Sequence, residues 1–367
     1  MLRRFVLVLA VLLQVGPLSA QKTEASDLQI EKIADGFDTP WALAFLPEPE
    51  GGVLVTERGG KLYHVGPDGR KTRIAGVPQV VARGQGGLLD VMLPRDFQQN
   101  REVFLSFSRR QGRGAGTALA VASLSEDRSQ LIGLKVIFEM APGSSGGRHY
   151  GSRIVEAPDG HLFLTIGERG DRPSAQDLGR HNGSIIRLSR DGSAPKNNPF
   201  VSTAGTQPEI WSYGHRNPQG MALDLQGRLW AVEHGAKGGD ELNLIEKGGN
   251  YGWPVIAYGR HYSGLPIGEG THKSGMMQPR HFWDPSIAPS GLMVYSGKLW
   301  PQWRGAFFVG SLKFDYISRL SPDGRGEVAQ IKTRETARVR DVREAPDGSI
   351  WFLSEDRGAI YRITPAP

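Results

Sequence analysis

The sequence has no cysteine among its 367 residues. Disulfide bonds, iron–sulfur clusters, thiolate metal sites and a lipid-modified N-terminal cysteine are therefore excluded. A dense run of Lys and Arg is also lacking, since the basic residues behind the formal net charge of +6 are spread along the chain. This distribution argues against nucleic acid as a partner, but it is compatible with a local basic pocket for a small polyanion.

Long apolar runs are lacking as well. The N-terminal run Phe5–Val15 is too short for a permanent bilayer span. It follows the basic residues 3–4 and precedes the small residues 19–20, an order typical of a secretory signal peptide. We therefore predict a signal peptide over residues 1–20, a periplasmic or secreted location and no stable membrane insertion. An uncleaved membrane anchor is the alternative.

No long amphipathic helix is evident after residue 30, whereas the chain contains 49 glycines and 24 prolines. This composition favours many short strands joined by tight turns. The phrase Glu-Ala-Pro-Asp-Gly occurs at residues 156–160 and 344–348, each time between two strand-like segments. The pattern predicts β-hairpins with Pro-Asp-Gly turns.

Looser copies of the hairpin pattern raise the number of repeats to six, starting near residues 41, 87, 152, 219, 291 and 341. Spacings of roughly 50–70 residues suit a four-stranded blade with its loops. We therefore predict an all-β fold, a six-bladed β-propeller with four-stranded blades that forms a single domain over residues 21–367. Two stacked β-sandwiches are the alternative all-β arrangement.

A propeller binds its ligands at one end of the central channel, so site residues should be scattered through the repeats. His149 lies in the glycine-rich loop 146–151, and Glu168 follows the strand expected to pair with the one after His149. Such a pair suits a general base near neutral pH whose imidazole is oriented by a carboxylate. A surface histidine in a loop is the alternative.

Cationic side chains occur at similar places in other repeats. Arg216 and Asn217 precede the fourth repeat, and a guanidinium beside an amide suits a carboxylate or quinone oxygen. Arg338 and Arg340 alternate along a strand, so they share a face and repel each other unless an anion lies between them. Lys313 could add a further cation. The alternatives are a backbone turn at Asn217 and a solvated strand face for the two arginines.

The loop 233–241, with the sequence EHGAKGGDE, is flexible and contains acidic residues. Its carbonyl and carboxylate oxygens are hard ligands that suit calcium, although the spacing is not that of an EF-hand.

Together these segments resemble the soluble quinoprotein sugar dehydrogenases, especially the shorter aldose sugar dehydrogenase branch, from about Gly36 to Ile363. The strings that carry the resemblance occur in order at residues 84–89, 191–200, 214–220, 239–243 and 247–254. The resemblance implies a six-bladed propeller that holds pyrroloquinoline quinone (PQQ) and calcium over its channel. It also implies oxidation of aldose sugars and an electron acceptor that is not identified. The longer insertions of the glucose-specific branch are missing, which implies an open pocket and broad aldose use.

The resemblance also implies roles for individual residues. His149 would take the proton from the anomeric hydroxyl of the sugar, and Glu168 would orient His149. The residues implied to hold the cofactor are Gln85, Arg216, Asn217, Lys313, Arg338, Arg340 and Trp283. Those implied to contact the sugar are Gln85 and Tyr262. Calcium at the cofactor would bind the backbone carbonyls of Gly235 and Ala236, and a second, structural calcium would bind Glu241 and Tyr251.

Three positions depart from the family pattern. Arg148 precedes the base where the glucose-oxidising branch has an acid, Glu168 replaces a shorter acid, and Ala236 stands where relatives often have proline. These differences bear most directly on substrate choice.

Two other functions stay open at this stage. A calcium-dependent propeller lactonase or esterase would need carboxylates from several blades and no basic cluster, so Lys313, Arg338 and Arg340 count against it. A non-catalytic binding propeller is the second alternative, because a fold does not fix function. The pairing of His149 with Glu168 counts against this second alternative.

Overall fold

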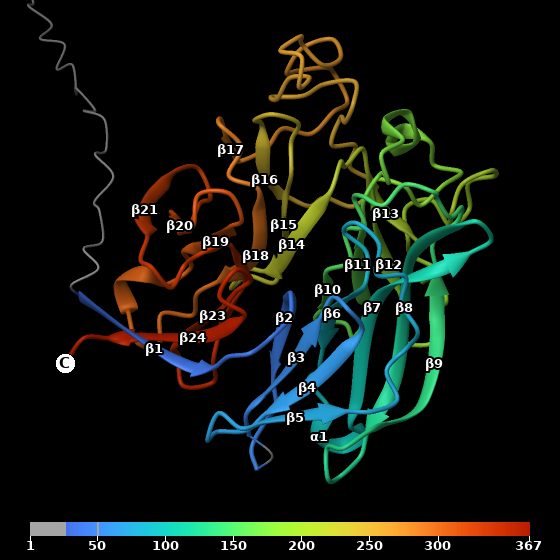
Figure 1. The fold of residues 1–367 in the computed structure, drawn as a ribbon. Coiled ribbons are helices and arrows are strands. Elements are labelled where there is room, and N and C mark those ends of the chain that lie inside the picture. Colours follow the sequence, from blue (N-terminus) through green and yellow to red (C-terminus); the bar gives the residue numbers. More distant parts are fainter. Residues whose placement is uncertain (1–26, 50) are drawn as a thin grey trace, which may run out of the picture.

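The computed structural model describes residues 27–49 and 51–367, and these residues form six four-stranded antiparallel sheets. The sheets are arranged as the blades of a β-propeller (Figure 1). This architecture confirms the fold and the number of blades predicted from the repeats. The predicted signal peptide, residues 1–20, lies outside the described residues. In the described part of the chain, no helix combines the length and the hydropathy needed to cross a membrane.

The first three blades follow one another along the chain. Blade 1 consists of β2 (Pro40–Phe45), β3 (Val53–Glu57), β4 (Lys61–Val65) and β5 (Lys71–Ile74). Blade 2 consists of β6 (Leu88–Met92), β7 (Glu102–Gln111), β8 (Gly114–Leu124) and β9 (Leu131–Glu139). Blade 3 consists of β10 (Ile154–Glu156), β11 (Leu162–Ile166), β12 (Ser184–Leu188) and β13 (Ile210–Tyr213).

The remaining blades continue the order, and only the last one departs from it. Blade 4 consists of β14 (Pro218–Leu223), β15 (Leu229–Glu233), β16 (Asp240–Leu244) and β17 (His281–Trp283). Blade 5 consists of β18 (Pro289–Val294), β19 (Phe307–Ser311), β20 (Ile317–Leu320) and β21 (Glu327–Ile331). Blade 6 consists of β22 (Val339–Glu344), β23 (Ile350–Ser354), β24 (Ala359–Pro365) and β1 (Leu28–Ala34). The short helices are α1 (Phe97–Asn100), η2 (Arg172–Gln176) and η3 (Pro301–Trp303).

The recurring Pro-Asp-Gly phrase forms the turn between the first and second strands of blades 3 and 6. Gly160 has a φ of +82° and donates its N–H to the carbonyl oxygen of Ala157 at 3.0 Å. Gly348 has a φ of +89° and donates to Ala345 at 2.8 Å. A side chain is strained at such a φ, so glycine is required where these hairpins turn.

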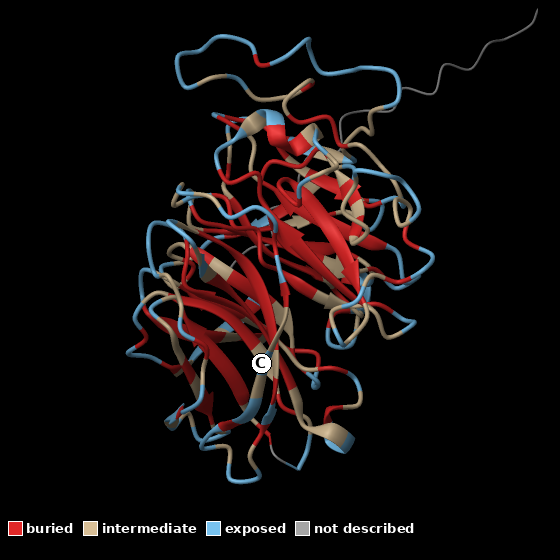
Figure 2. Cartoon of the chain, turned by 90° about the vertical axis from the view of Figure 1, so that its right-hand side faces the viewer, coloured by how far each residue is buried: buried red, intermediate tan, exposed pale blue. Residues whose placement is uncertain are grey.

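The second strand of a blade is covered on both of its faces by neighbouring blades. All five residues are buried in β3, in β11 and in β19. Each of these strands therefore begins with three consecutive apolar residues instead of an alternating pattern. Figure 2 shows the buried residues concentrated in the strands and the exposed ones in the loops. The core thus lies between the blades, and the loops remain available for polar side chains.

The ring is closed by strands from opposite ends of the described chain. β1 pairs antiparallel with β24, with Ile30 opposite Ile363. Blade 6 therefore contains one strand from the beginning of the fold and three from its end. The repeats in the sequence did not predict this pairing. It covers the edge that β24 would otherwise expose and joins the two ends of the ring.

Buried charges connect several blades at the channel. Arg153, which precedes β10, is 1% exposed and lies 2.8 Å from Asp90 of β6 and 3.3 Å from Asp341 of β22. Its Nε donates to the carbonyl oxygen of Gln219 in β14 at 3.1 Å. Arg343 contacts the same two carboxylates. Because these charged groups are removed from water, the stability of each one depends on its ion-pair partners.

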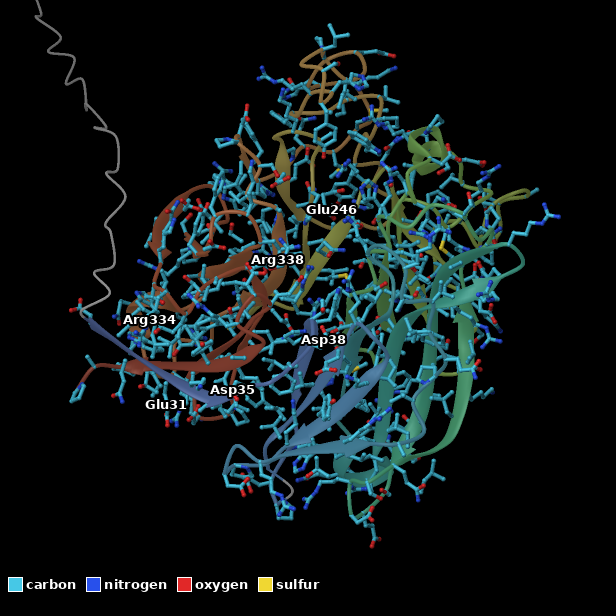
Figure 3. The ribbon with its side chains drawn as sticks, in the orientation of Figure 1. Glu31, Asp35, Asp38, Glu246, Arg334 and Arg338 are labelled. Atoms are coloured by element: carbon cyan, nitrogen blue, oxygen red, sulfur yellow. The ribbon has the colours of Figure 1, made fainter. Side chains whose placement is uncertain are left out.

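We predict that Arg153→Met lowers the free energy of unfolding by about 3–5 kcal/mol, because it leaves two buried carboxylates short of a partner. Arg334→Met is the matched control. Its side chain lies toward the periphery (Figure 3), is 89% exposed and contacts only the neighbouring Glu335 among its ion pairs with described residues. The control should leave the free energy of unfolding nearly unchanged, because its side chain is exposed. Urea unfolding followed by tryptophan fluorescence measures both, and equal effects would contradict the assigned role of Arg153.

Candidate active site

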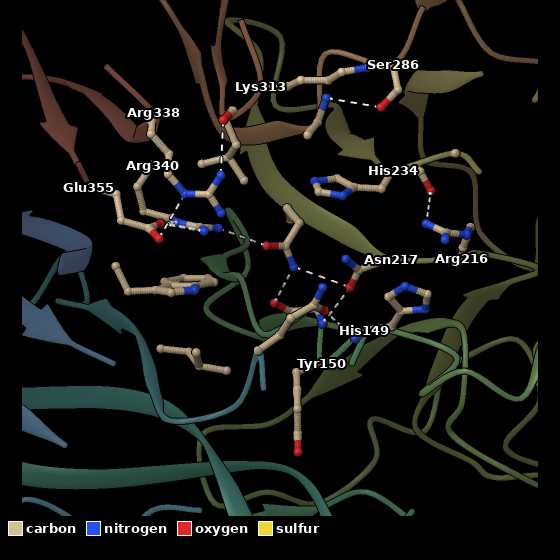
Figure 4. Close-up of a pocket in the computed structure, with 18 of the residues that line it drawn as sticks. His149, Tyr150, Arg216, Asn217, His234, Ser286, Lys313, Arg338, Arg340 and Glu355 are labelled. Atoms are coloured by element: carbon tan, nitrogen blue, oxygen red, sulfur yellow. Dashed lines mark hydrogen bonds and ion pairs between the residues drawn. The ribbon is translucent and has the colours of Figure 1, made fainter. Parts of the chain in front are cut away.

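A cavity of about 540 Å³ is lined by described residues of all six blades. Most lining residues lie at the start of the first strand of a blade, in the loop before it or in the loop after the second strand, and Tyr262 comes from the loop between β16 and β17. Among the residues singled out from the sequence, those that line it are Gln85, His149, Arg216, Asn217, Gly235, Tyr262, Lys313, Arg338 and Arg340. Figure 4 shows how several of them face one another. The propeller thus gathers residues that are up to 314 positions apart, from Trp41 to Glu355, at one site.

His149 is held against Glu168, which lies behind it and away from the cavity lining. The imidazole Nδ1 is hydrogen-bonded to the Glu168 carboxylate, and the two side chains are 10% and 1% exposed. The carboxylate also accepts a hydrogen bond from the N–H of Gly170 at 2.9 Å. Because a carboxylate accepts the Nδ1 proton, the neutral ring has an unprotonated Nε2.

The backbone around His149 adopts an unusual conformation that its neighbours maintain. His149 has a φ of +55°, which is uncommon for a residue with a side chain. Its N–H donates to Oε1 of Gln85 at 2.6 Å, and Asn217 Oδ1 accepts the N–H of Gly151 at 3.2 Å. Two other cavity residues therefore fix the loop that carries the imidazole.

The pKa of His149 is lowered from its usual value of 6.5, chiefly because the ring is buried. The hydrogen bond to Glu168 raises the pKa, and the Arg216 guanidinium lowers it. The balance keeps the ring neutral near pH 7, which is the state that a proton acceptor needs.

The cavity is strongly cationic. Its basic lining residues are Arg58, Arg216, Lys237, Lys313, Arg338 and Arg340, against the single carboxylate of Glu355 among the described residues that line it. Arg216 is 7% exposed, and its Nε is buried without a hydrogen-bond partner. Burial lowers the pKa of Arg216, because it disfavours the charged form. A site of this kind favours a small anion with several negative charges.

Glu355 is the anion that the spacing of Arg338 and Arg340 required. Its Oε1 accepts from Nε of Arg338 at 3.0 Å, and its Oε2 accepts from Nε of Arg340 at 2.7 Å. The carboxylate lowers the repulsion between the two guanidiniums and holds them in place (Figure 4). Arg340 NH1 reaches Gln219 Oε1 at 3.4 Å. Sequence reasoning missed both Glu355 and Gln219.

A glutamate at the end of the second strand, or within two residues after it, recurs in four blades as Glu57, Glu168, Glu233 and Glu355. Each one accepts hydrogen bonds from the loop before, or the start of, the first strand of its own blade. Glu57 accepts from the N–H of Asp38 at 2.8 Å, and Glu233 accepts from the N–H of Arg216 at 2.7 Å. Glu168 binds His149, and Glu355 binds the two arginines. This repeated glutamate was the sequence signal that could have identified Glu355.

His234 is a second cavity histidine that the sequence analysis did not assign to a function. Its Nε2 is 2.7 Å from the carbonyl oxygen of Pro289, and its own carbonyl oxygen accepts from Arg216 at 3.2 Å. Burial and the nearby Arg216 lower the pKa of His234 to about 3. The ring is therefore neutral, with its N–H on Nε2.

The residues implied for calcium lie beside a much smaller cavity of about 20 Å³. Gly235, Ala236, Glu241 and Tyr251 all line it, together with Glu233. Glu241 pairs with Glu233 across β15 and β16, and burial together with that carboxylate raises the pKa of Glu241. The described residues contain no group of three or more His, Cys, Asp or Glu arranged to hold a metal ion. A cation here would therefore depend on carbonyl oxygens as well as on Glu241.

The structure places Tyr251 beside the small cavity and Trp283 away from the cationic one. The Tyr251 hydroxyl donates to the Leu244 carbonyl and accepts from the N–H of Glu246, so its backbone oxygen is the better metal ligand. Trp283 does not line the cavity. It is buried in the core of blades 4 and 5, and its indole N–H donates to Glu327 at 3.3 Å. Because β17 is the outermost strand of its blade, Trp283 stands away from the channel.

A sequence profile of the family described as Glucose / Sorbosone dehydrogenase matches residues 37–362. The chain is 42% identical over 355 residues to the aldose sugar dehydrogenase YliI of Escherichia coli K12, covering 95% of each chain.

Two solved structures are similar along nearly their whole length. The apo-form of the soluble aldose sugar dehydrogenase from E. coli has a TM-score of 0.90 at 41% identity, over 92% of this chain and all of that one. The PQQ-bound aldose sugar dehydrogenase from Streptomyces coelicolor has a TM-score of 0.76 at 29% identity, over 92% of this chain and 98% of that one. The chain therefore belongs to the glucose/sorbosone dehydrogenase family of oxidoreductases.

Proposed function

We propose that this chain oxidises aldose sugars at C1 to the corresponding lactones, using PQQ and calcium, with His149 as the proton acceptor. The observation that carries the proposal is the cluster of six cations around a buried histidine–carboxylate pair in one cavity. The E. coli relative is named as an aldose sugar dehydrogenase, and the Streptomyces structure is PQQ-bound, which supports the same assignment. The N-terminal sequence supports a periplasmic or secreted location.

The cavity fits PQQ in charge and in size. PQQ carries three carboxylates, and the six basic side chains could neutralise them while Glu355 keeps two of those cations in place. The partnerless Nε of buried Arg216 is a donor that an acidic ligand would satisfy. A volume of about 540 Å³ lies in the range of small-molecule and cofactor sites. Arg216, Asn217, Lys313, Arg338 and Arg340 are the residues proposed to hold the cofactor.

The chain's own groups would move the proton. Glu168 fixes Nδ1 of His149, so Nε2 is free to accept the proton of the anomeric hydroxyl. The carboxylate then stabilises the imidazolium that results. Gln85 and Tyr262, at the exposed side of the cavity, are the residues proposed to contact the sugar. When bound, PQQ supplies the acceptor for the hydride that leaves C1, so loss of both hydrogens yields the lactone.

The channel carboxylates argue against a calcium-dependent lactonase. Asp90 and Asp341 are both engaged by Arg153 and Arg343, so they are not free to bind a metal.

One assay separates the three candidate functions. Purified apoprotein is mixed with an aldose and a redox dye, with PQQ and calcium added singly and together. Dye reduction that requires both additions supports the proposal, whereas lactone hydrolysis without PQQ supports a lactonase. Neither activity would indicate a binding propeller.

We predict that His149→Ala lowers turnover by about 10²–10⁴-fold while PQQ binding is retained, because only the proton acceptor is lost. In the wild type, turnover should rise with pH through a midpoint below 6.5, since the base must be neutral and its pKa is lowered. Normal turnover of the variant would exclude His149 as the base.

Glu168→Gln removes the group that raises the pKa of His149. We therefore expect the acid midpoint to move to still lower pH while the maximal turnover falls, because the imidazolium loses its carboxylate. Glu57→Gln is the matched control, since it alters the equivalent position of blade 1. Turnover measured from pH 4 to 8 should show the shifted midpoint in Glu168→Gln alone. A shift of equal size in the control would mean that the effect is structural.

Calcium is proposed at two places, the carbonyls of Gly235 and Ala236 beside the cofactor and a structural site at Glu241 and Tyr251. For the structural site, we predict that calcium raises the melting temperature of the apoprotein, because a cation offsets the repulsion between Glu233 and Glu241. Glu241→Gln should abolish most of that rise and be at least as stable as the wild type in chelator. Glu246→Gln, which changes a nearby exposed acid, is the control. An unchanged calcium response in Glu241→Gln would refute the site.

A further inference from the structure

The cavity contains two histidines that are anchored in different ways. His149 is anchored through Nδ1 to a carboxylate, whereas His234 is anchored through Nε2 to the carbonyl oxygen of Pro289 at 2.7 Å. Both rings line the cavity, and the ring of His234 points into it (Figure 4). Each ring therefore has one nitrogen fixed by the protein and one nitrogen without a partner among the described residues.

The two anchors give the rings different chemistry. The carboxylate of Glu168 stabilises a positively charged imidazole, so His149 can take up a proton. The carbonyl of Pro289 carries no net charge, and the backbone oxygen of His234 is already engaged by the Arg216 guanidinium. The anchor at Nε2 therefore fixes which ring nitrogen carries the hydrogen. Since its N–H is on Nε2, Nδ1 presents a lone pair to the cavity.

Most charged groups of this cavity are donors, because its lining has six basic side chains and one carboxylate among the described residues. The side-chain oxygens of Gln85, Asn217, Gln219 and Glu355 already accept hydrogen bonds from described residues. A ligand that carries an N–H or O–H donor as well as carboxylates therefore finds an uncommitted ring acceptor at His234.

We infer that Nδ1 of His234 accepts a hydrogen bond from the bound cofactor, and so makes His234 a cofactor-binding residue. The inference rests on the proposed function, because it takes PQQ to be the ligand. The donor offered by PQQ is the N–H of its pyrrole ring. His234 is half-buried and lies beside Arg216, one of the residues proposed to hold the cofactor, whereas Gln85 and Tyr262 are exposed. This position favours the cofactor over the sugar as the partner.

Two substitutions separate the acceptor from the anchor. His234→Gln can keep a donor near the position of Nε2, and so the bond to Pro289, but it has no acceptor where Nδ1 lies. His234→Asn places its Oδ1 near the position of Nδ1 and gives up the anchor. The apoprotein is titrated with PQQ in the presence of calcium and without sugar, and the dissociation constant is measured by quenching of tryptophan fluorescence. Thermal unfolding of each apoprotein checks that the fold is intact.

We expect His234→Gln to raise the dissociation constant of PQQ by roughly 2–10-fold, the effect of one lost hydrogen bond. His234→Asn should stay within about 2-fold of the wild type, because it retains an acceptor. The inference is wrong if the Gln variant binds like the wild type, if the Asn variant loses as much as the Gln variant, or if only the KM for the sugar changes. Failure of the wild type to bind PQQ would instead overturn the proposed function.

Discussion

The pairing of β1 with β24 is the constraint on which the rest of the structure depends. The cavity is lined by side chains from all six blades, so its geometry exists only while the blades are held in a closed ring. Arg58 of blade 1 and Arg338 of blade 6 face the same cavity from the two blades that this closure holds together. Inside the ring, Arg153 ties blades 2, 3 and 6 through Asp90 and Asp341 and contacts Gln219, which itself lines the cavity. The position of the site is therefore set by long-range contacts, even though each blade is built from local hairpins.

The glutamate that follows the second strand shows how one structural position can serve two purposes. In blade 1, Glu57 accepts a backbone N–H from the loop before its blade and forms an ion pair with Lys61, so its described contacts are structural. In blade 3, the same position carries Glu168, whose partner is an imidazole, and the contact now sets the tautomer and the basicity of His149. In blade 6, Glu355 binds two guanidiniums and keeps them together in the cavity. The repeat provides a carboxylate at the same end of four blades. The residue that the loop presents to this carboxylate decides whether it only stabilises the loop or also acts on a group of the cavity.

Sequence reasoning succeeded where the signal was local. The Pro-Asp-Gly turns and their flanking strands placed the start of each blade within two residues of its first strand, because a hairpin is specified by neighbouring residues. It missed β1, a single strand whose partner lies more than 300 residues away and which forms no hairpin of its own. The place of Trp283 in the core, away from the cavity, depends on β17 being the outer strand of its blade, which no local pattern reveals. Glu355 and His234 were missed because their importance arises from contacts between loops, although the recurring glutamate was visible in the sequence.

The cations that suit the cavity to an anionic ligand also act on the base. Arg216 lowers the pKa of His149, and Glu168 opposes it. A ligand with several carboxylates would neutralise Arg216 and its neighbours and so remove part of that effect. His149 would then become a stronger base once the anion is in place, at the moment when a proton has to be accepted. The affinity for the anion and the basicity of His149 thus depend on the same charge distribution, because Arg216 contributes to both. A substitution at Arg216 cannot change one without the other, whereas Glu168 adjusts the base from behind, outside the cavity lining.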